Sequence, residues 1–187
     1  MNTPSYVFNF PNMPRKPKKR NEVQIVDVVW KFKLKNDAKK ASFNFCTSEE
    51  NKRTPYQLEL SFSQDEGVDA RSKVTQNRQL ADGSMVYGKK ENNKLVMLRK
   101  HSYTMMFSLF EQAPDENGNK QKIKAYLVTT PSQYCEKGKV YQTPNCEKDV
   151  EVELDQIKSV ELRDDFEYLE EFTFRVYNDS AKEQPKK

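Results

Sequence analysis

The segment YQLELSFS, residues 56–63, alternates apolar and polar side chains along its whole length. Its apolar members are Tyr56, Leu58, Leu60 and Phe62. Successive side chains of a strand point to opposite faces of a sheet, so this period of two predicts a strand with one buried face. The segment therefore favours a β domain.

The same alternation recurs along the chain, separated by turn-forming residues. Segments with this pattern are 28–34, 43–45, 84–90, 94–100, 102–111, 121–130, 150–154 and 172–176. Asn117-Gly118 lies between two of them and is a strong signal for a β-hairpin, because both residues tolerate positive φ. Residues 64–83 are expected to form a long polar connection, with room for a short helix.

About eight to ten strands with short connections and no long amphipathic helix predict an all-β fold with antiparallel pairing. One apolar face per strand requires two sheets packed face to face, or a closed barrel. Only five glycines are present, which favours the sandwich over the tight corners of a small barrel. We therefore predict an antiparallel two-sheet β-sandwich of immunoglobulin-like, jelly-roll or C2-like topology. Its expected extent is residues 22–178.

The first 21 residues contain four prolines and a cluster of basic residues, MPRKPKKR at 13–20. Proline fixes φ and lacks an amide donor, so the stretch 1–21 is predicted to be a flexible arm. Residues 179–187 are expected to be a disordered polar tail. A proline-flanked basic cluster fits a nuclear localisation signal, a contact to nucleic-acid phosphates or a solvated tail. The basic residues of the arm are Arg15, Lys16, Lys18, Lys19 and Arg20.

Charge is distributed unevenly along the chain. Residues 1–40 carry ten Lys and Arg against three Asp and Glu, a balance of +7, whereas residues 147–179 carry four against twelve, a balance of −8. Lys31, Lys33 and Lys35 share the polar face of their predicted strand, where they could add to a phosphate-facing surface. The preferred interpretation is that basic and acidic strands lie side by side and neutralise each other.

Residues that could support catalysis are scarce. His101 is the single histidine, and Cys46, Cys135 and Cys146 do not have the paired short spacing of structural zinc sites. The odd number of cysteines and the lack of an apolar leader favour free thiols in a reducing compartment, although Cys135 and Cys146 could pair under oxidising conditions. Glycine-rich phosphate loops are absent. We expect no catalytic residues, no metal site and no cofactor.

These features predict a non-enzymatic binding or scaffold module, intracellular and nuclear or nucleic-acid-associated, that works as a subunit of a larger complex. Its partners would be proteins and, through sequence-independent phosphate contacts, nucleic acid. One alternative is a coat-type jelly roll that self-assembles. A second alternative is a calcium- or membrane-binding C2-like module that would use the acidic residues near 164–171. The chain contains no apolar run of about 18 residues, so no membrane span is expected.

Overall fold

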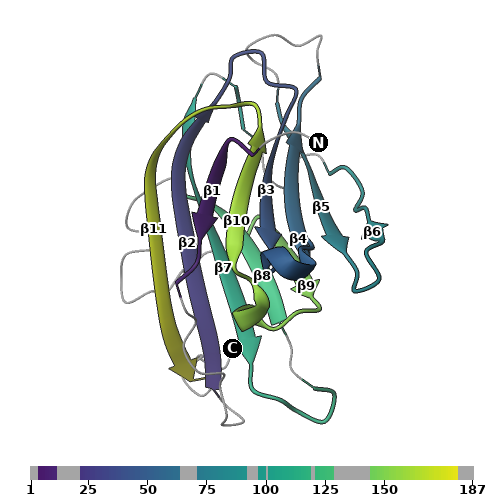
Figure 1. Cartoon of the computed structure of the whole chain (residues 1–187). Helices are drawn as coiled ribbons and strands as arrows, with labels where there is room; N and C mark the ends of the chain where they lie inside the picture. The colour runs from purple at the N-terminus through teal and green to yellow at the C-terminus, as the bar shows by residue number, and fades with distance from the viewer. Residues whose placement is uncertain are drawn as a thin grey trace.

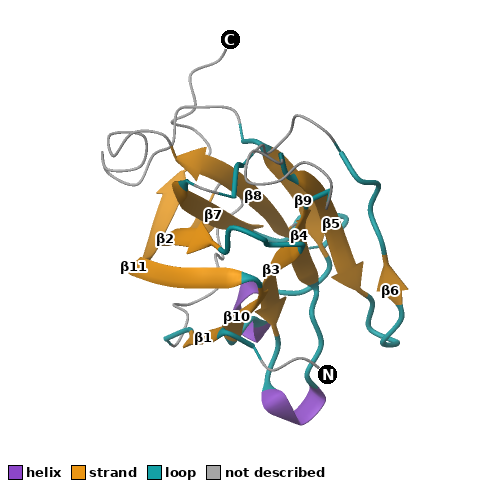
Figure 2. Cartoon of the chain, turned by 90° about the horizontal axis from the view of Figure 1, so that it is seen from above, coloured by secondary structure: helices purple, strands orange, loops and turns teal. Residues whose placement is uncertain are grey.

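The computed structural model of the chain describes residues 4–11, 22–63, 71–91, 97–99, 101–118, 121–128 and 144–180. In these residues the chain forms two antiparallel sheets that pack face to face (Figure 1). Figure 2 shows the layers from above, with β1 and β10 on one side and β7 and β8 on the other. The predicted all-β, two-sheet sandwich is confirmed. No helix in these ranges has the length and apolar character needed to cross a membrane.

The first sheet, sheet A, has six strands in the order β1-β10-β3-β4-β5-β6. Their bounds are β1 (Tyr6–Asn9), β10 (Ser159–Asp164), β3 (Lys40–Cys46), β4 (Tyr56–Ser61), β5 (Lys73–Gln79) and β6 (Met85–Val86). All neighbouring pairs are antiparallel. The apolar residues of the opening segment face inward from β4, where alternate residues are buried.

The second sheet, sheet B, has five strands in the order β11-β2-β7-β8-β9. Their bounds are β11 (Phe166–Ser180), β2 (Glu22–Leu34), β7 (Ser102–Gln112), β8 (Gln121–Val128) and β9 (Cys146–Val150). The predicted hairpin around Asn117-Gly118 joins β7 to β8, and Gly118 adopts φ +91°. Two short 3-10 helices, η1 (Glu49–Asn51) and η3 (Leu154–Gln156), lie in connections.

Aromatic rings from both sheets fill the core. Trp30 of β2 is completely buried, and its ring centroid lies 5.7 Å from those of both Phe43 on β3 and Phe107 on β7. Tilted and edge-on contacts of this kind stabilise a core beyond the burial of apolar area. The rings therefore fix how the two sheets pack against each other. The opposite face of each sheet points outward.

Part of the predicted arm belongs to the fold. Strand β1 pairs with β10, and the Phe8 ring packs 5.9 Å from Trp30. Beyond the strand, the Phe10 ring lies 5.0 Å from Phe174 of β11. The apolar side chains of this segment thus close one side of the sandwich. The basic cluster at 13–20 lies outside the described residues.

Two other segments differ from expectation. Residues 73–79, assigned by sequence to a long polar connection, form strand β5, because its outward side chains are polar and its inward face is anchored by Val74. Residues 150–154 do not continue as a strand: β9 ends at Val150 and the chain enters η3. Residues 64–70 of the expected connection are not among those described.

Oppositely charged strands lie side by side, as the preferred interpretation of the charge distribution predicted. Strand β2 pairs with β11 along its whole length. Lys31 lies 3.1 Å from Glu170, and Lys33 lies 2.5 Å from Glu167. These exposed or half-exposed pairs contribute little stability, but they neutralise the basic side chains of β2.

Candidate functional site

A line of polar side chains crosses the outer face of sheet A. Glu161 of β10, Asn44 of β3, Gln57 of β4 and Asn77 of β5 are direct neighbours in the strand register. We call these four residues the polar row. The sequence neighbours of Glu161, Asn44 and Gln57 are buried apolar residues, so the alternation that builds the core places these three outside, and the strand register places Asn77 beside Gln57.

Hydrogen bonds join the members of the polar row. Asn77 donates from Nδ2 to Gln57 Oε1 at 2.8 Å, and Gln57 donates from Nε2 to Asn44 Oδ1 at 2.6 Å. Asn44 donates from Nδ2 to the carbonyl oxygen of Glu161 at 3.0 Å. At the other end, the backbone N–H of Gly88 donates to Asn77 Oδ1 at 3.0 Å. Such chains polarise one another, so each bond strengthens the next.

The two ends of the polar row fix the orientation of every amide between them. The Gly88 N–H can only donate, and the Glu161 carbonyl can only accept. Asn77, Gln57 and Asn44 must therefore all present oxygen toward Gly88 and nitrogen toward Glu161. The amide orientations follow from these fixed backbone groups.

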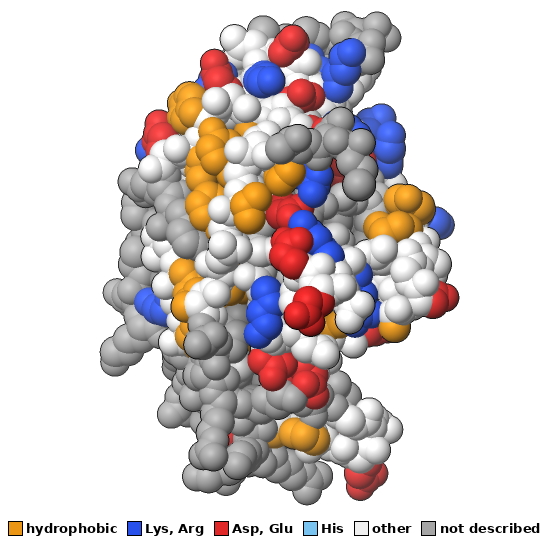
Figure 3. Space-filling view, in the orientation of Figure 1, with side chains coloured by type: hydrophobic (Ala, Val, Ile, Leu, Met, Phe, Trp, Pro, Cys, Tyr) orange, Lys and Arg blue, Asp and Glu red, His pale blue; other side chains and the backbone are white. Residues whose placement is uncertain are grey.

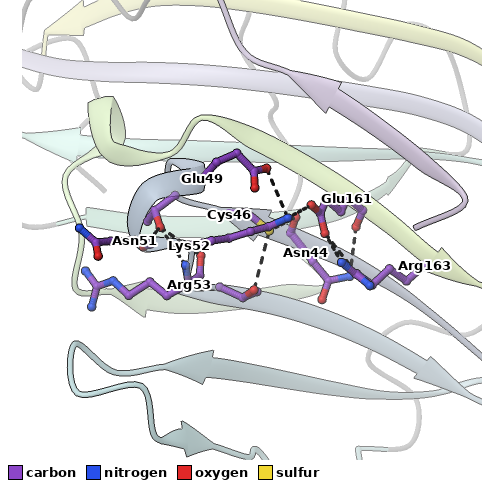
Figure 4. Close-up of polar contacts among 10 residues, drawn as sticks. Asn44, Cys46, Glu49, Asn51, Lys52, Arg53, Glu161 and Arg163 are labelled. Carbon is purple, nitrogen blue, oxygen red and sulfur yellow. Dashed lines mark hydrogen bonds and ion pairs between the residues drawn. The ribbon is translucent and has the colours of Figure 1, made fainter. Parts of the chain in front are cut away.

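The carboxylate of Glu161 holds two cationic side chains at one end of the polar row (Figure 4). Lys52, from the connection after η1, and Arg163, two residues along β10, both bond to it. Burial alone would raise the pKa of the Glu161 carboxyl, but the bonds from Lys52 and Arg163 outweigh burial and lower that pKa. The bond to Glu161 likewise raises the pKa of Lys52. The Glu161 carboxyl and the Lys52 ammonium are therefore charged at neutral pH.

Cys46 lies beside this cluster and is inert rather than reactive. Its side chain is buried, and its sulfur lies 3.7 Å from Thr54 Oγ1. Burial raises the pKa of the thiol, which disfavours the nucleophilic thiolate. Cys46 and Cys146 are both buried, whereas Cys135 lies outside the described residues, so the pairing of Cys135 with Cys146 under oxidising conditions is not addressed.

The surface above the polar row is rich in hydrogen-bond donors. Asn44, Asn77 and Glu161 are buried, whereas Gln57, Lys52 and Arg163 are partly exposed. The buried members therefore act as supports, and the exposed members present an amide, an ammonium and a guanidinium to solvent. In the space-filling view, acidic and basic side chains mix along the middle of this face of the molecule (Figure 3).

Tyr87 lies where the polar row ends near β6. It directly precedes Gly88, whose N–H bonds Asn77, and it is 73% exposed. An exposed aromatic ring beside fixed polar groups offers one apolar surface and several directional ones. This combination suits binding.

Residues considered for metal binding or catalysis are engaged elsewhere or exposed. Asp165 Oδ2 accepts the backbone N–H groups of Lys39 and Lys40, at 2.8 and 3.2 Å, so this carboxylate shapes a turn. Within the ranges that the structure describes, no cluster of three or more His, Cys, Asp or Glu could hold a metal ion. His101 is exposed, with its ring 6.3 Å from that of Tyr103.

The residues predicted from sequence to bind phosphate do not form the polar row. Lys31 and Lys33 pair with Glu170 and Glu167 on sheet B, as described above. Lys35 is exposed at the end of β2 and donates its backbone N–H to the Asp165 carbonyl at 2.9 Å. The remaining predicted residues lie outside the described part of the chain: Arg15, Lys16, Lys18, Lys19 and Arg20.

Sequence reasoning missed the polar row. Gln57 stands among the polar residues of the opening segment, and its outward position was predicted, but Asn44 and Glu161 lie 117 positions apart. Only the strand order places them next to each other. Amide and carboxyl side chains at outward positions of several strands were the signal available in the sequence.

Comparisons with known proteins return galectins among solved structures. Xenopus laevis galectin-Ib matches with a TM-score of 0.47 and 14% identity, covering 91% of this chain and 98% of that chain. Sheep galectin-11 in complex with glycerol gives 0.46 and 13%, covering 94% and 99%. Chicken galectin 2 gives 0.41 and 14%, covering 80% and 89%. No protein-family model and no curated protein matches the chain.

These results correct the predicted function. The nuclear or nucleic-acid-associated subunit, the coat-type protein and the C2-like module are all wrong, because the similar solved structures are galectins. The fold supplies a physical reason as well: β11 neutralises the basic face of β2, so this strand presents no open cationic surface to phosphate. At identities of 13 to 14%, function has to be inferred from this chain's own residues.

Proposed function

We propose that the chain is a non-enzymatic carbohydrate-binding module that takes its ligand on the outer face of sheet A. The observation that carries this proposal is the polar row, in which buried amides and a buried carboxylate hold Gln57, Lys52 and Arg163 in fixed outward positions. Carbohydrates present closely spaced hydroxyls that both donate and accept. Planar amides and guanidinium groups match such hydroxyls with two parallel hydrogen bonds.

The side chains on this face are already ordered before a ligand binds, which lowers the entropic cost of binding through weak polar contacts. Ordering a long side chain on binding costs about 0.5–1.5 kcal/mol. Lys52 and Arg163 are already held by Glu161, and Gln57 by Asn44 and Asn77. A ligand on this face therefore meets side chains that are already ordered. The exposed ring of Tyr87 supports the same proposal, because the C–H face of a sugar stacks on an aromatic ring.

The test is a glycan array of neutral and acidic oligosaccharides probed with the purified full chain. We expect saturable binding to a subset of glycans that weakens about tenfold in Tyr87→Ala, the most exposed of the side chains involved. Gln57→Ala is expected to weaken binding as well, with its melting temperature measured to separate binding from folding.

Lys124→Ala is the matched control, because Lys124 lies on sheet B with its ammonium 4.5 Å from the Phe110 ring centroid. It should bind glycans like the unmodified protein. Absence of binding to every glycan, or binding that Tyr87→Ala and Gln57→Ala leave intact, would overturn the proposed function.

A further inference from the structure

A polar pocket of about 440 Å³ lies at the end of the sandwich next to the polar row. Its walls come from the connection after β3, which contains η1, and from the connection after β9, which contains η3. Its volume falls within the range of pockets that hold small ligands. Every residue that lines it is polar or charged, which favours a polar ligand.

Backbone and side-chain hydrogen bonds brace both walls. Thr47 donates its backbone N–H to the Arg53 carbonyl at 3.0 Å, and Thr47 Oγ1 accepts the Arg53 N–H at 2.9 Å. Lys158 donates its backbone N–H to the Cys46 carbonyl at 2.9 Å. Glu153 and Gln156 form a reciprocal capping box at η3. The pocket is thus built from two short loops that are held by hydrogen bonds within and between them.

The charges that line the pocket are not equivalent. The Glu153 carboxylate accepts the backbone N–H of Gln156, and Asp155 has interactions of its own. In contrast, the side chains of Arg53 and Lys158 make no hydrogen bond or ion pair to any group in the described residues. Figure 4 shows Arg53 and Asn51 extending to the same side, away from Glu161. The cationic side chains of the pocket are therefore available to a ligand.

We propose that this pocket binds the anionic group, a carboxylate or a sulfate ester, of an acidic sugar through Arg53 and Lys158. A guanidinium matches either group with two parallel bonds, and an ammonium adds a second charge. Asn51, which also lines the pocket, supplies an amide for a neighbouring hydroxyl. Because two acidic residues line the pocket beside the two basic ones, a ligand with a single negative charge is favoured over a polyanion.

The position of the pocket links it to the candidate site, and the inference rests on the proposed function in that respect. Lys52, which bonds Glu161, stands in the sequence between two pocket residues, Asn51 and Arg53. Lys158 directly precedes β10 and stands three residues before Glu161, a distance of about 10 Å along an extended chain. A ligand of two or three sugar units therefore spans the polar row and the pocket.

The test is a titration of the ¹⁵N-labelled full chain, followed by backbone amide shifts, with D-glucuronic acid, D-glucose 6-sulfate and D-glucose. We expect the acidic sugars to shift amides of residues 47–53 and 153–158 at concentrations about five- to tenfold below those at which glucose does. Arg53→Gln combined with Lys158→Gln should abolish this preference, while Lys124→Gln should retain it. The two acidic probes distinguish a carboxylate site from a sulfate site.

Each outcome decides between the two proposals. Equal binding of glucose and the acidic sugars, with shifts confined to the polar row, overturns the acidic pocket and keeps the proposed function. Preference for acidic sugars that survives the double substitution also overturns the pocket. Acidic sugars that shift only the pocket residues support the pocket; if glucose in addition shifts no residue of the polar row, the polar row is not a binding site for these sugars. No shift with any of the three sugars overturns the pocket, whereas the proposed function is overturned only by the glycan array.

Discussion

Asn44→Asp tests whether the fold is stabilised by the common donor-to-acceptor direction of the hydrogen bonds in the polar row. The substitution preserves size but replaces the Nδ2 donor with an oxygen. Nδ2 donates to the Glu161 carbonyl at 3.0 Å and to Ser42 Oγ at 2.9 Å. The Ser42 hydroxyl can rotate and donate to the introduced carboxylate. The Glu161 carbonyl cannot, so two oxygens would face each other at a buried position, where Asn44 is 4% exposed.

The expected cost follows from these contacts. A buried acceptor left without its donor costs about 1–3 kcal/mol. Burying a carboxylate beside a carbonyl, close to the Glu161 charge, adds about 1 kcal/mol or more. We therefore expect the free energy of unfolding to fall by about 2–4 kcal/mol at pH 7.5, a large part of the total stability of an ordinary domain.

The pH dependence gives the test its specificity. The protonated form of the introduced carboxyl can donate to the Glu161 carbonyl, so its pKa in the folded state is raised above the unfolded value. A group with a raised carboxyl pKa destabilises the fold above that pKa and does so less as pH falls. Relative to the unmodified protein, the deficit should therefore be smaller at pH 5 than at pH 7.5.

The assay is urea unfolding followed by the fluorescence of Trp30, the single tryptophan, for both proteins at both pH values. Gln57→Glu is the matched control: it makes the same change in a partly exposed side chain and should cost about half as much. Equal stabilities of Asn44→Asp and the unmodified protein at pH 7.5, or a deficit that does not depend on pH, would refute the reasoning.

Three further predictions concern the core, the turn at the end of the polar row and the free thiols. Trp30→Ala should lower the free energy of unfolding by about 3–5 kcal/mol, measured by urea unfolding with circular dichroism, because its fully buried ring bridges the sheets; a loss under 1 kcal/mol would contradict the described packing. Gly88→Ala should lower the melting temperature and disturb the Asn77 amide signal, since the added Cβ would lie 2.4 Å from the Gln76 carbonyl oxygen; an unchanged spectrum would show that the chain is not this close. Cys46 should react with a thiol reagent at pH 8 only after unfolding, because burial raises the pKa of its thiol; rapid labelling of native protein, resolved by peptide mapping, would argue against this burial.

The strands that sequence predicted best are those with one strictly apolar face. Strand β4 was evident because every second residue is apolar and the segment spans a complete crossing of the sheet. Strand β5 was missed because its sequence KVTQNRQ carries a single apolar anchor, Val74, and looks polar throughout. Strand β1 was missed because the prolines around it suggested an arm, although Phe8 and Phe10 pack on the core side.

The candidate site was less accessible to sequence reasoning than the fold. Alternation tells which side chains leave the core, but not which outward side chains become neighbours on the sheet. Asn44 and Glu161 meet only because β10 inserts between β1 and β3, and Lys52 reaches them from an irregular connection. The charges drew attention to the arm and to β2, where the fold pairs the lysines with acidic residues of β11.

The polar row also has a consequence for how sheet A assembles. Backbone ladders are nearly indifferent to a slip of two residues along a strand, because such a slip keeps apolar side chains inside. A slip of β4 past β3 would carry Gln57 away from Asn44 and break the continuity between Gly88 and Glu161. Misaligned pairings would thus leave several amides unsatisfied at once. The side chains of the polar row therefore specify the alignment of neighbouring strands. The alternating apolar face alone does not specify it.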